Sequence, residues 1–337
     1  MPGASPPMTP RMHEDASTAM SIAFVFPGQG SQAIGMGREL AEAFPAAREV
    51  FEAVDETLKQ SLSRLMFEGP AEELTLTANA QPALMAVSMA VLRVLEQEGG
   101  FVLKERVALV AGHSLGEYSA LAAAQTFDVP TAARLLRLRG EAMQKAVPAG
   151  MGAMAALLGA EMAQAQEICA RAAETPEGAT EVVEAANDNG GGQVVISGHR
   201  GAVERAVALA KEAGIKRAML LPVSAPFHCA LMAPAADAMA EALALAELRP
   251  PLVPVVANVT AAKATDPVEI RELLVRQVTG TVRWRECVAT MAGLGCDRFV
   301  EIGAGKVLTG LMKRLAPEAQ AMSVGGPAEI EAFLKTL

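Results

Sequence analysis

Short runs of consecutive apolar residues alternate with longer segments of helical periodicity in the first half of the chain. SIAFVF at 21–26 and VALVAG at 107–112 are continuous apolar runs next to Pro or Gly, a pattern typical of buried strands. Between them, residues 46–62 and 81–97 carry apolar side chains at helical spacing. Strands that alternate with helices predict a mainly parallel sheet with helices on both faces.

The pattern changes after Pro148, where shorter segments follow one another in a new order. That order, β-α-β-β-α-β, predicts a ferredoxin-like unit at 150–222, inserted into a larger α/β domain made of 21–149 and 223–337. The elements expected in the insert are strands at 152–159, 181–186, 193–197 and 218–223 and helices at 161–173 and 201–213. After the insert, the larger domain continues with strands expected at 253–257 and 298–302.

Composition narrows the functional classes. The 337 residues are 51% hydrophobic and 20% charged, which is enough apolar surface for a dense core. A formal net charge of -9 and an aromatic content of 4% argue against nucleic acid as a partner. The longest low-charge stretch, 146–160, is interrupted by Pro148 and several glycines, so we expect no membrane span there.

The amino terminus and the cysteines indicate the compartment. Residues 1–20 carry Pro, Arg, His, Glu and Asp where a signal peptide needs an apolar run, so we expect a disordered N-terminal extension. The chain has neither a C-x-x-C pair nor regular cysteine spacing, which argues against a zinc site and a disulfide framework. We therefore expect a soluble cytoplasmic monomer with no metal or other cofactor.

Gly112-His113-Ser114-Leu115-Gly116 matches the pattern G-x-S-x-G. The bare pattern is common in glycine-rich turns, but here a buried strand precedes it and a helical segment follows it, as the nucleophile motif requires. Such a turn lifts the serine hydroxyl clear of the sheet and places it at a helix N-terminus, whose dipole favours an oxyanion. Ser114 is therefore the candidate nucleophile, and the backbone N–H of Leu115 is a candidate oxyanion donor.

A serine hydroxyl needs a base, and the chain offers four histidines. His13 lies in the predicted extension, His113 is expected to pack beside the nucleophile, and His199 follows a Ser-Gly turn and is expected at the surface. His228, in SAPFHCALM, follows a strand and a proline-containing turn that can present it at the end of the sheet. His228 is the candidate base.

A Ser-Asp-His triad in this order would need an acid between Ser114 and His228. Asp128 and Asp188 stand in poor contexts for that role. We therefore expect a dyad, in which a main-chain carbonyl orients the imidazole.

Six motifs together resemble the malonyl-CoA:acyl carrier protein transacylases of type II fatty acid synthesis. They are PGQGSQ (27–32), GHSLGEYSA (112–120), RLRGEAMQ (137–144), QVVISG (193–198), SAPFH (224–228) and GAGKVLTGL (303–311). The likeness covers roughly residues 21–315 in the family's order, and it implies an α/β-hydrolase-like core with a ferredoxin-like insert. One departure is Gln125, where the family usually has a small residue.

The resemblance implies a ping-pong transfer of malonyl from malonyl-CoA to the phosphopantetheine thiol of acyl carrier protein. Ser114 would be the nucleophile, His228 the base, and the backbone N–H of Gln29 the second oxyanion donor. Arg139 would bind the malonyl carboxylate, because a planar guanidinium can hold a carboxylate in two parallel hydrogen bonds. Gln277 matches the position whose backbone carbonyl orients the imidazole.

Two further features bear on specificity. Phe227 resembles malonyl-selective members, since a bulky ring leaves less room for a 2-methyl group. Carrier proteins of this pathway are acidic, so an acidic enzyme needs a local positive patch to dock one, and we expect Lys306, Lys313 or Arg314 to contribute.

Two further sequence patterns and two other functions compete with this interpretation. Residues 28–33 fit G-x-G-x-x-A, but the acidic residues about twenty positions on lie in a helical pattern, which argues against a dinucleotide site. Residues 303–306 resemble part of a Walker loop that lacks its first Gly and its Ser or Thr. A thioesterase or other serine hydrolase is the rival enzyme, and a non-catalytic carrier-binding scaffold is the rival from another class.

Overall fold

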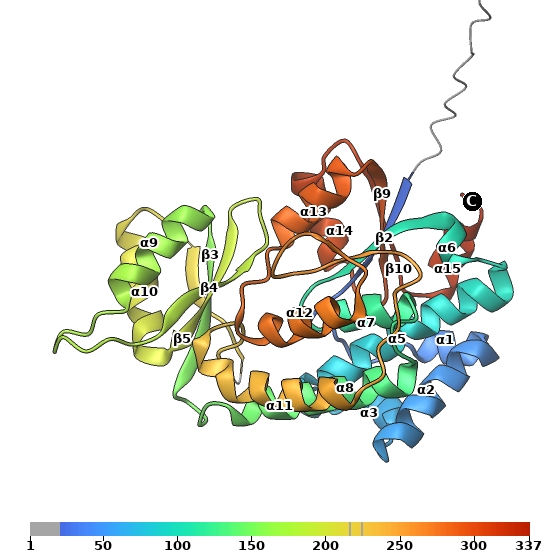
Figure 1. The fold of residues 1–337 in the computed structure, drawn as a ribbon, viewed down its shortest axis with the longest axis horizontal. Helices are drawn as coiled ribbons and strands as arrows, with labels where there is room; N and C mark the ends of the chain where they lie inside the picture. The colour runs from blue at the N-terminus through green and yellow to red at the C-terminus, as the bar shows by residue number, and fades with distance from the viewer. Residues whose placement is uncertain (1–20, 216, 224) are drawn as a thin grey trace, which may run out of the picture.

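Two β-sheets organise the chain (Figure 1). The computed structural model describes residues 21–215, 217–223 and 225–337; the predicted extension at 1–20, with His13, and position 224 of SAPFH lie outside the described residues. In the larger sheet the strand order is β10-β9-β1-β2-β7-β8, with β8 antiparallel and the other pairings parallel. Its strands are β1 (Ser21–Phe26), β2 (Val107–Gly112), β7 (Val255–Val256), β8 (Lys263–Ala264), β9 (Cys296–Ile302) and β10 (Gln320–Val324).

Alternate residues of β1 face opposite sides of the large sheet, as the pleat of a strand requires. Phe24 and Phe26 join one apolar core, whereas Ala23 and Val25 join another core with Trp284. Both faces are therefore buried, which explains why β1 reads as an uninterrupted apolar run. Helices α13 (Trp284–Gly293) and α14 (Val307–Leu315) contribute to the second core.

The first core is built by most of the remaining helices of the large unit. They are α1 (Arg38–Ala43), α2 (Pro45–Leu58), α3 (Leu62–Glu68), α4 (Ala71–Thr75), α5 (Thr77–Gly99), α6 (Leu103–Arg106), α7 (Gly116–Ala123), α8 (Val129–Lys145), α11 (Ala233–Leu245), α12 (Pro267–Thr279) and α15 (Pro327–Leu334). A short 3-10 turn, η1 (Ala230–Met232), precedes α11. Among the described helices, α5 is long and apolar enough to cross a membrane, yet 89% of its most apolar window is buried inside the protein.

Some predicted boundaries are wrong. The single helix expected at 46–62 is two helices, because Lys59 adopts a left-handed backbone (φ 51°) that ends α2 at Leu58. The strand expected at 253–257 pairs only at Val255 and Val256. Strands β8 and β10 were not predicted.

The smaller sheet is antiparallel throughout, with strand order β4-β5-β3-β6. Its elements follow the predicted order β-α-β-β-α-β, and α9 and α10 pack with the strands in a separate core that includes Leu157, Ile168 and Ile196. They are β3 (Gly152–Leu158), α9 (Met162–Ala172), β4 (Val183–Asp188), β5 (Gln193–His199), α10 (Arg200–Glu212) and β6 (Arg217–Leu220).

The two sheets are tied together beside the carboxyl end of β2. The Asp188 N–H donates to the Val282 carbonyl at 2.9 Å, and the Val282 N–H donates to the Ala186 carbonyl at 2.9 Å. The Thr281 hydroxyl adds a bond to the Ala185 carbonyl at 2.7 Å. These bonds hold the end of β4 against the large unit, next to the turn that carries Ser114.

Candidate active site

Ser114 occupies a sharp turn between β2 and α7. Its backbone is left-handed (φ 53°), a conformation that costs free energy for a residue with a Cβ atom. A Cβ atom at Gly112 would lie 1.9 Å from main-chain atoms of Gly116, and one at Gly116 would lie 2.3 Å from the carbonyl oxygen of Phe26. Only glycine fits these two positions, because main-chain atoms cannot move aside cheaply.

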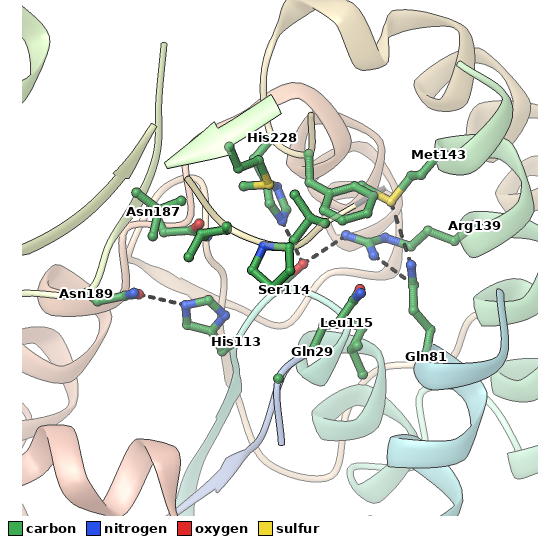
Figure 2. A pocket seen from close by; sticks show the side chains of 17 residues that line it. Gln29, Gln81, His113, Ser114, Leu115, Arg139, Met143, Asn187, Asn189 and His228 are labelled. Atoms are coloured by element: carbon green, nitrogen blue, oxygen red, sulfur yellow. Dashed lines mark hydrogen bonds between the residues drawn. The ribbon is translucent and has the colours of Figure 1, made fainter. Parts of the chain in front are cut away.

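Ser114 and His228 meet although 114 positions separate them in the chain (Figure 2). The serine hydroxyl lies 2.7 Å from His228 Nε2, and His228 Nδ1 lies 2.9 Å from the main-chain oxygen of Gln277. A carbonyl can only accept, so Nδ1 carries the hydrogen and Nε2 is left to accept the serine proton. His228, like Ser114, has a left-handed backbone (φ 58°).

The imidazole of His228 is kept neutral by its surroundings. Burial, and after it the positive charge of Arg139, together lower its pKa to about 3. The hydrogen bond to the Gln277 carbonyl opposes this shift. The imidazole of His228 is therefore neutral across the physiological range, with Nε2 able to accept a proton.

Arg139 is a buried cation directed at the nucleophile. Its side chain is 1% exposed, and Nη2 donates to Ser114 Oγ at 3.2 Å. Nη1 donates to Gln81 Oε1 at 2.8 Å, and Nη2 also donates to Gln277 Oε1 at 2.8 Å. Among the described residues, no carboxylate lies within ion-pair distance of this guanidinium, and its Nε has no acceptor. Since an unpaired buried charge is costly, the site is suited to an anionic ligand.

The two candidate oxyanion donors lie next to Ser114. In Figure 2, Gln29 and Leu115 lie on the side of Ser114 away from His228. The side chain of Gln29 accepts a hydrogen bond from the Thr77 hydroxyl at 2.9 Å, which holds the loop after β1 in place. In the described part of the chain, neither the Gln29 nor the Leu115 amide has an intramolecular acceptor, so both remain available to a substrate oxygen.

These groups open on a cavity of about 330 Å³ between the two sheets. Part of its polar lining surrounds Ser114 and part lies at Asn187 and Asn189, while most of its wall is apolar, as in many small-molecule sites. Phe227 is 8% exposed and forms part of the wall beside His228. The other apolar lining residues are Leu115, Met143, Met154, Val195, Leu221, Pro222 and Val223.

The other described histidines have structural partners. His113 Nε2 lies 2.8 Å from Asn189 Oδ1, and the ring packs edge-on against Trp284 with centroids 5.7 Å apart. His113 thus joins the two sheets beside Ser114, and burial lowers its pKa. His199 is half-buried, and its Nδ1 accepts from the Val182 N–H at 2.9 Å.

The two acids considered for a triad are engaged elsewhere. Asp128 caps α8 through a bond from the Thr131 N–H at 2.8 Å, and Asp188 pairs with Arg285 at 2.8 Å. The imidazole of His228 is instead oriented by the Gln277 carbonyl.

Three polar residues of the site were missed by sequence reasoning. Gln81 holds Arg139, Asn258 Oδ1 accepts from the Ser114 N–H at 2.8 Å, and Glu117 accepts from Asn258 and Gln277. Each is almost fully buried. Their signal was a polar residue within or directly after an apolar segment, as in TANAQPALMAV, VPVVAN and GHSLGEY.

Burial raises the pKa of Glu117 to about 7, against the opposing effect of its hydrogen bonds from Asn258 and Gln277 and of the Arg139 charge.

The three cations predicted for carrier docking lie outside the cavity, on α14 or directly before it. Lys306 precedes the helix and pairs with Glu329 at 3.0 Å, whereas Lys313 and Arg314 are exposed in its last turn. Arg314 Nη1 also donates to the carbonyl of Gly191, in the β4–β5 turn, at 3.1 Å.

Gln125, the noted departure, has a left-handed backbone (φ 60°) just after α7. A small residue such as glycine meets no steric cost at such a φ, which gives a physical reason for the usual choice there. Gln125 does not line the cavity that contains Ser114.

Comparison with known proteins agrees with this geometry. The acyl transferase domain family matches residues 23–326. The chain is 47% identical to the malonyl CoA-acyl carrier protein transacylase of Escherichia coli (strain K12) over 93% of this chain and 99% of that protein. The crystal structure of an acyl-carrier-protein-S-malonyltransferase from Bartonella henselae is similar with a TM-score of 0.91 and 57% identity, covering 94% of this chain and 99% of the other.

A second similar structure is a complex of a type II PKS acyl-carrier protein with its malonyl-transacylase. Its TM-score is 0.89 at 44% identity, over 94% of this chain and 100% of that one.

Proposed function

We propose, because this chain belongs to the family of malonyl CoA-acyl carrier protein transacylases, that it carries a malonyl group between two thiols as an ester on Ser114. The enzyme transfers malonyl from malonyl-CoA to acyl carrier protein, which supplies fatty acid synthesis. The observation that carries the proposed chemistry is the convergence of His228 Nε2 and Arg139 Nη2 on Ser114 Oγ, at 2.7 and 3.2 Å.

In the first half-reaction, Ser114 Oγ attacks the thioester carbon while His228 Nε2 takes its proton. The carbonyl oxygen becomes an oxyanion that accepts from the Gln29 and Leu115 amides. Collapse breaks the C–S bond, and the imidazolium returns the proton to the CoA sulfur. The product is a malonyl ester on Ser114 and free CoA thiol.

The second half-reaction uses the same groups in reverse. The phosphopantetheine thiol of the carrier gives its proton to His228, its sulfur attacks the ester, and the C–O bond to Ser114 breaks as Oγ regains a proton. Transfer prevails over hydrolysis only if water is excluded from the ester. The mainly apolar walls of the cavity support that exclusion.

Arg139 serves both halves by holding the malonyl carboxylate. A bound carboxylate pairs the buried guanidinium, whereas an acetyl group leaves the charge unpaired. Pairing also cancels the charge that depresses the pKa of His228, so substrate binding makes the imidazole a stronger base. The buried ring of Phe227 supports selection against a 2-methyl group.

For the architecture, we propose an α/β-hydrolase-like core made of 21–149 and 223–337 and a ferredoxin-like subdomain made of 150–222. The order β4-β5-β3-β6 and the two helices packed on that sheet support the second assignment. We expect the enzyme to act in the cytoplasm as a monomer. Its four cysteines are free and buried, which fits a reducing compartment.

The test of the function is intact-protein mass spectrometry. Malonyl-CoA alone should add one malonyl group, and subsequent addition of holo-carrier protein should remove it with formation of malonyl-carrier. Release of free malonate in its place would indicate a thioesterase. No mass increase at all would indicate a carrier-binding scaffold.

The pH dependence of acylation should reflect the depressed pKa of His228. Because the pKa is lowered, the neutral base persists to lower pH, so the single-turnover acylation rate should show no fall centred near the ordinary histidine pKa of about 6.5 and should stay level to about pH 5. Rapid-quench mass spectrometry across this range measures the rate. A protonation limb with its midpoint near the ordinary value would contradict the assignment of His228 as a desolvated base.

Docking of the carrier should depend on the cations of α14. Charge reversal of Lys306, Lys313 and Arg314 together should raise the KM for the acidic carrier by about tenfold at low salt, with the KM for malonyl-CoA less affected. Steady-state kinetics at low and high salt measures this change.

The matched control reverses three other exposed cations, Lys104 and Arg106 of α6 and Lys335 directly after α15. Lys335 pairs with Glu331 at 2.6 Å much as Lys306 pairs with Glu329, so the control also loses an ion pair. Equal effects of the two triple variants would show that net charge, and not the α14 surface, attracts the carrier.

A further inference from the structure

A buried carboxylate lies directly beneath the nucleophile and takes no part in the steps above. Glu117 stands in the first turn of α7 and is 2% exposed. Its Oε2 accepts from Gln277 Nε2 at 2.8 Å and from the Asn258 N–H at 3.0 Å. Within the described chain it forms no ion pair, so these bonds are its main compensation for burial.

The side chain of Gln277 lies between two groups of opposite hydrogen-bonding character. An arginine can only donate, and Glu117 Oε2 faces two N–H donors, so this oxygen acts as an acceptor whether or not Oε1 carries a proton. The amide of Gln277 therefore has one orientation that satisfies both neighbours, with its NH₂ group toward Glu117 and its oxygen toward Arg139 Nη2 at 2.8 Å. In that orientation the NH₂ group also donates to the main-chain oxygen of Ser114 at 3.0 Å.

The second bond of Glu117 supports the other side of the turn. It holds the backbone of Asn258, whose side-chain oxygen accepts from the Ser114 N–H at 2.8 Å. The side-chain NH₂ of Asn258 donates to the Gly112 carbonyl at 2.7 Å. One carboxyl group thus holds the side-chain amide of Gln277 and the backbone of Asn258, the two residues whose side chains contact the backbone of Ser114.

We propose that Glu117 is a positioning residue that sets malonyl selectivity, by fixing the Gln277 amide so that its oxygen holds the Arg139 guanidinium for the substrate carboxylate. This role rests on the proposed function of Arg139. The orientation of His228 depends less on Glu117, because the Gln277 oxygen that orients it belongs to the main chain. Any disturbance of the Ser114 turn should lower kcat/KM for all thioesters alike and so should leave their ratio unchanged. Loss of the carboxylate should therefore harm the diacid substrate more than a monoacid.

The experiment compares kcat/KM for malonyl-CoA and acetyl-CoA in Glu117→Met and Glu117→Gln. Methionine keeps the length of the side chain but accepts no comparable bond, so the malonyl-to-acetyl ratio should fall roughly 10- to 100-fold, with a raised KM for malonyl-CoA. Glutamine can place its carbonyl oxygen where Oε2 lies, so it should keep the ratio within about threefold of the wild-type value.

Glu301 offers a matched control at another buried carboxylate. It is 0% exposed and accepts from the Leu308 and Thr309 N–H groups at 3.2 and 2.7 Å, away from Arg139. Glu301→Met should lower the unfolding temperature without changing the malonyl-to-acetyl ratio.

An unchanged ratio in folded Glu117→Met would overturn the proposal. A tenfold fall of the malonyl-to-acetyl ratio in Glu117→Gln with normal stability would also overturn it. This second result tests the proposal even if the methionine variant does not fold. Intact mass is recorded on the same samples. If the wild-type protein forms no malonyl ester, the proposed function is wrong. If the ester forms but the ratio differs from these expectations, only the proposed role of Glu117 is wrong.

Discussion

Ser114→Ala will leave a folded protein that gains no mass from malonyl-CoA and transfers malonyl at least about 10⁴-fold more slowly than the wild type. The hydroxyl that His228 contacts at 2.7 Å is the only atom lost. The oxyanion amides and Arg139 remain, so malonyl-CoA should still bind. Intact mass spectrometry and transfer to holo-carrier measure the two effects.

Two variants control for indirect effects at this turn. His228→Ala should lower the rate of malonyl transfer by a comparable factor. The double variant Ser114→Ala/His228→Ala should be little slower than either single variant, because nucleophile and base act as one unit. Ser114→Gly should be equally inactive yet more stable than Ser114→Ala by about 1 kcal/mol, since glycine adopts the left-handed backbone at 53° without strain. A malonyl ester found on Ser114→Ala would place the nucleophile elsewhere.

Arg139→Met will lower kcat/KM for malonyl-CoA by about 10²- to 10³-fold and will lower it much less for acetyl-CoA. The guanidinium that would pair with the substrate carboxylate is lost, whereas the Ser114–His228 pair remains. The free energy of unfolding should not fall by a comparable amount, because the variant removes a buried charge with no carboxylate partner among the described residues. Steady-state kinetics with both thioesters and thermal unfolding test these expectations.

Arg137→Met is the matched control, two positions earlier on α8. Its guanidinium donates to Gln60 and does not line the cavity, so the substitution should leave the malonyl-to-acetyl ratio unchanged. Arg139→Lys should regain little of the kcat/KM for malonyl-CoA that Arg139→Met loses, because an ammonium cannot reproduce the two parallel hydrogen bonds of a guanidinium. Equal losses for malonyl-CoA and acetyl-CoA in Arg139→Met would mean that Arg139 supports the fold of the site and not its selectivity.

Local features of the chain were predictable because they depend on neighbours in sequence. The buried run at 107–112, the glycines at 112 and 116 and the helix after them specify a strand, a tight turn and an exposed serine within about fifteen residues. The order of elements at 150–222 was predictable for the same reason. The break at Lys59 was not, because a lysine gives no signal of a left-handed backbone.

The parallel α/β core, the turn at Ser114 and the histidine available to it could thus be predicted from local sequence patterns. The way Arg139 is held, the contacts of Gln277 with both His228 and Arg139, and the bracing of Ser114 by Glu117 and Asn258 became visible only in the folded protein. These contacts join positions up to 163 residues apart. Short-range periodicity carries no information about such pairs, because they form only when the carboxyl ends of separate strands and the helices around them assemble at one edge of the sheet.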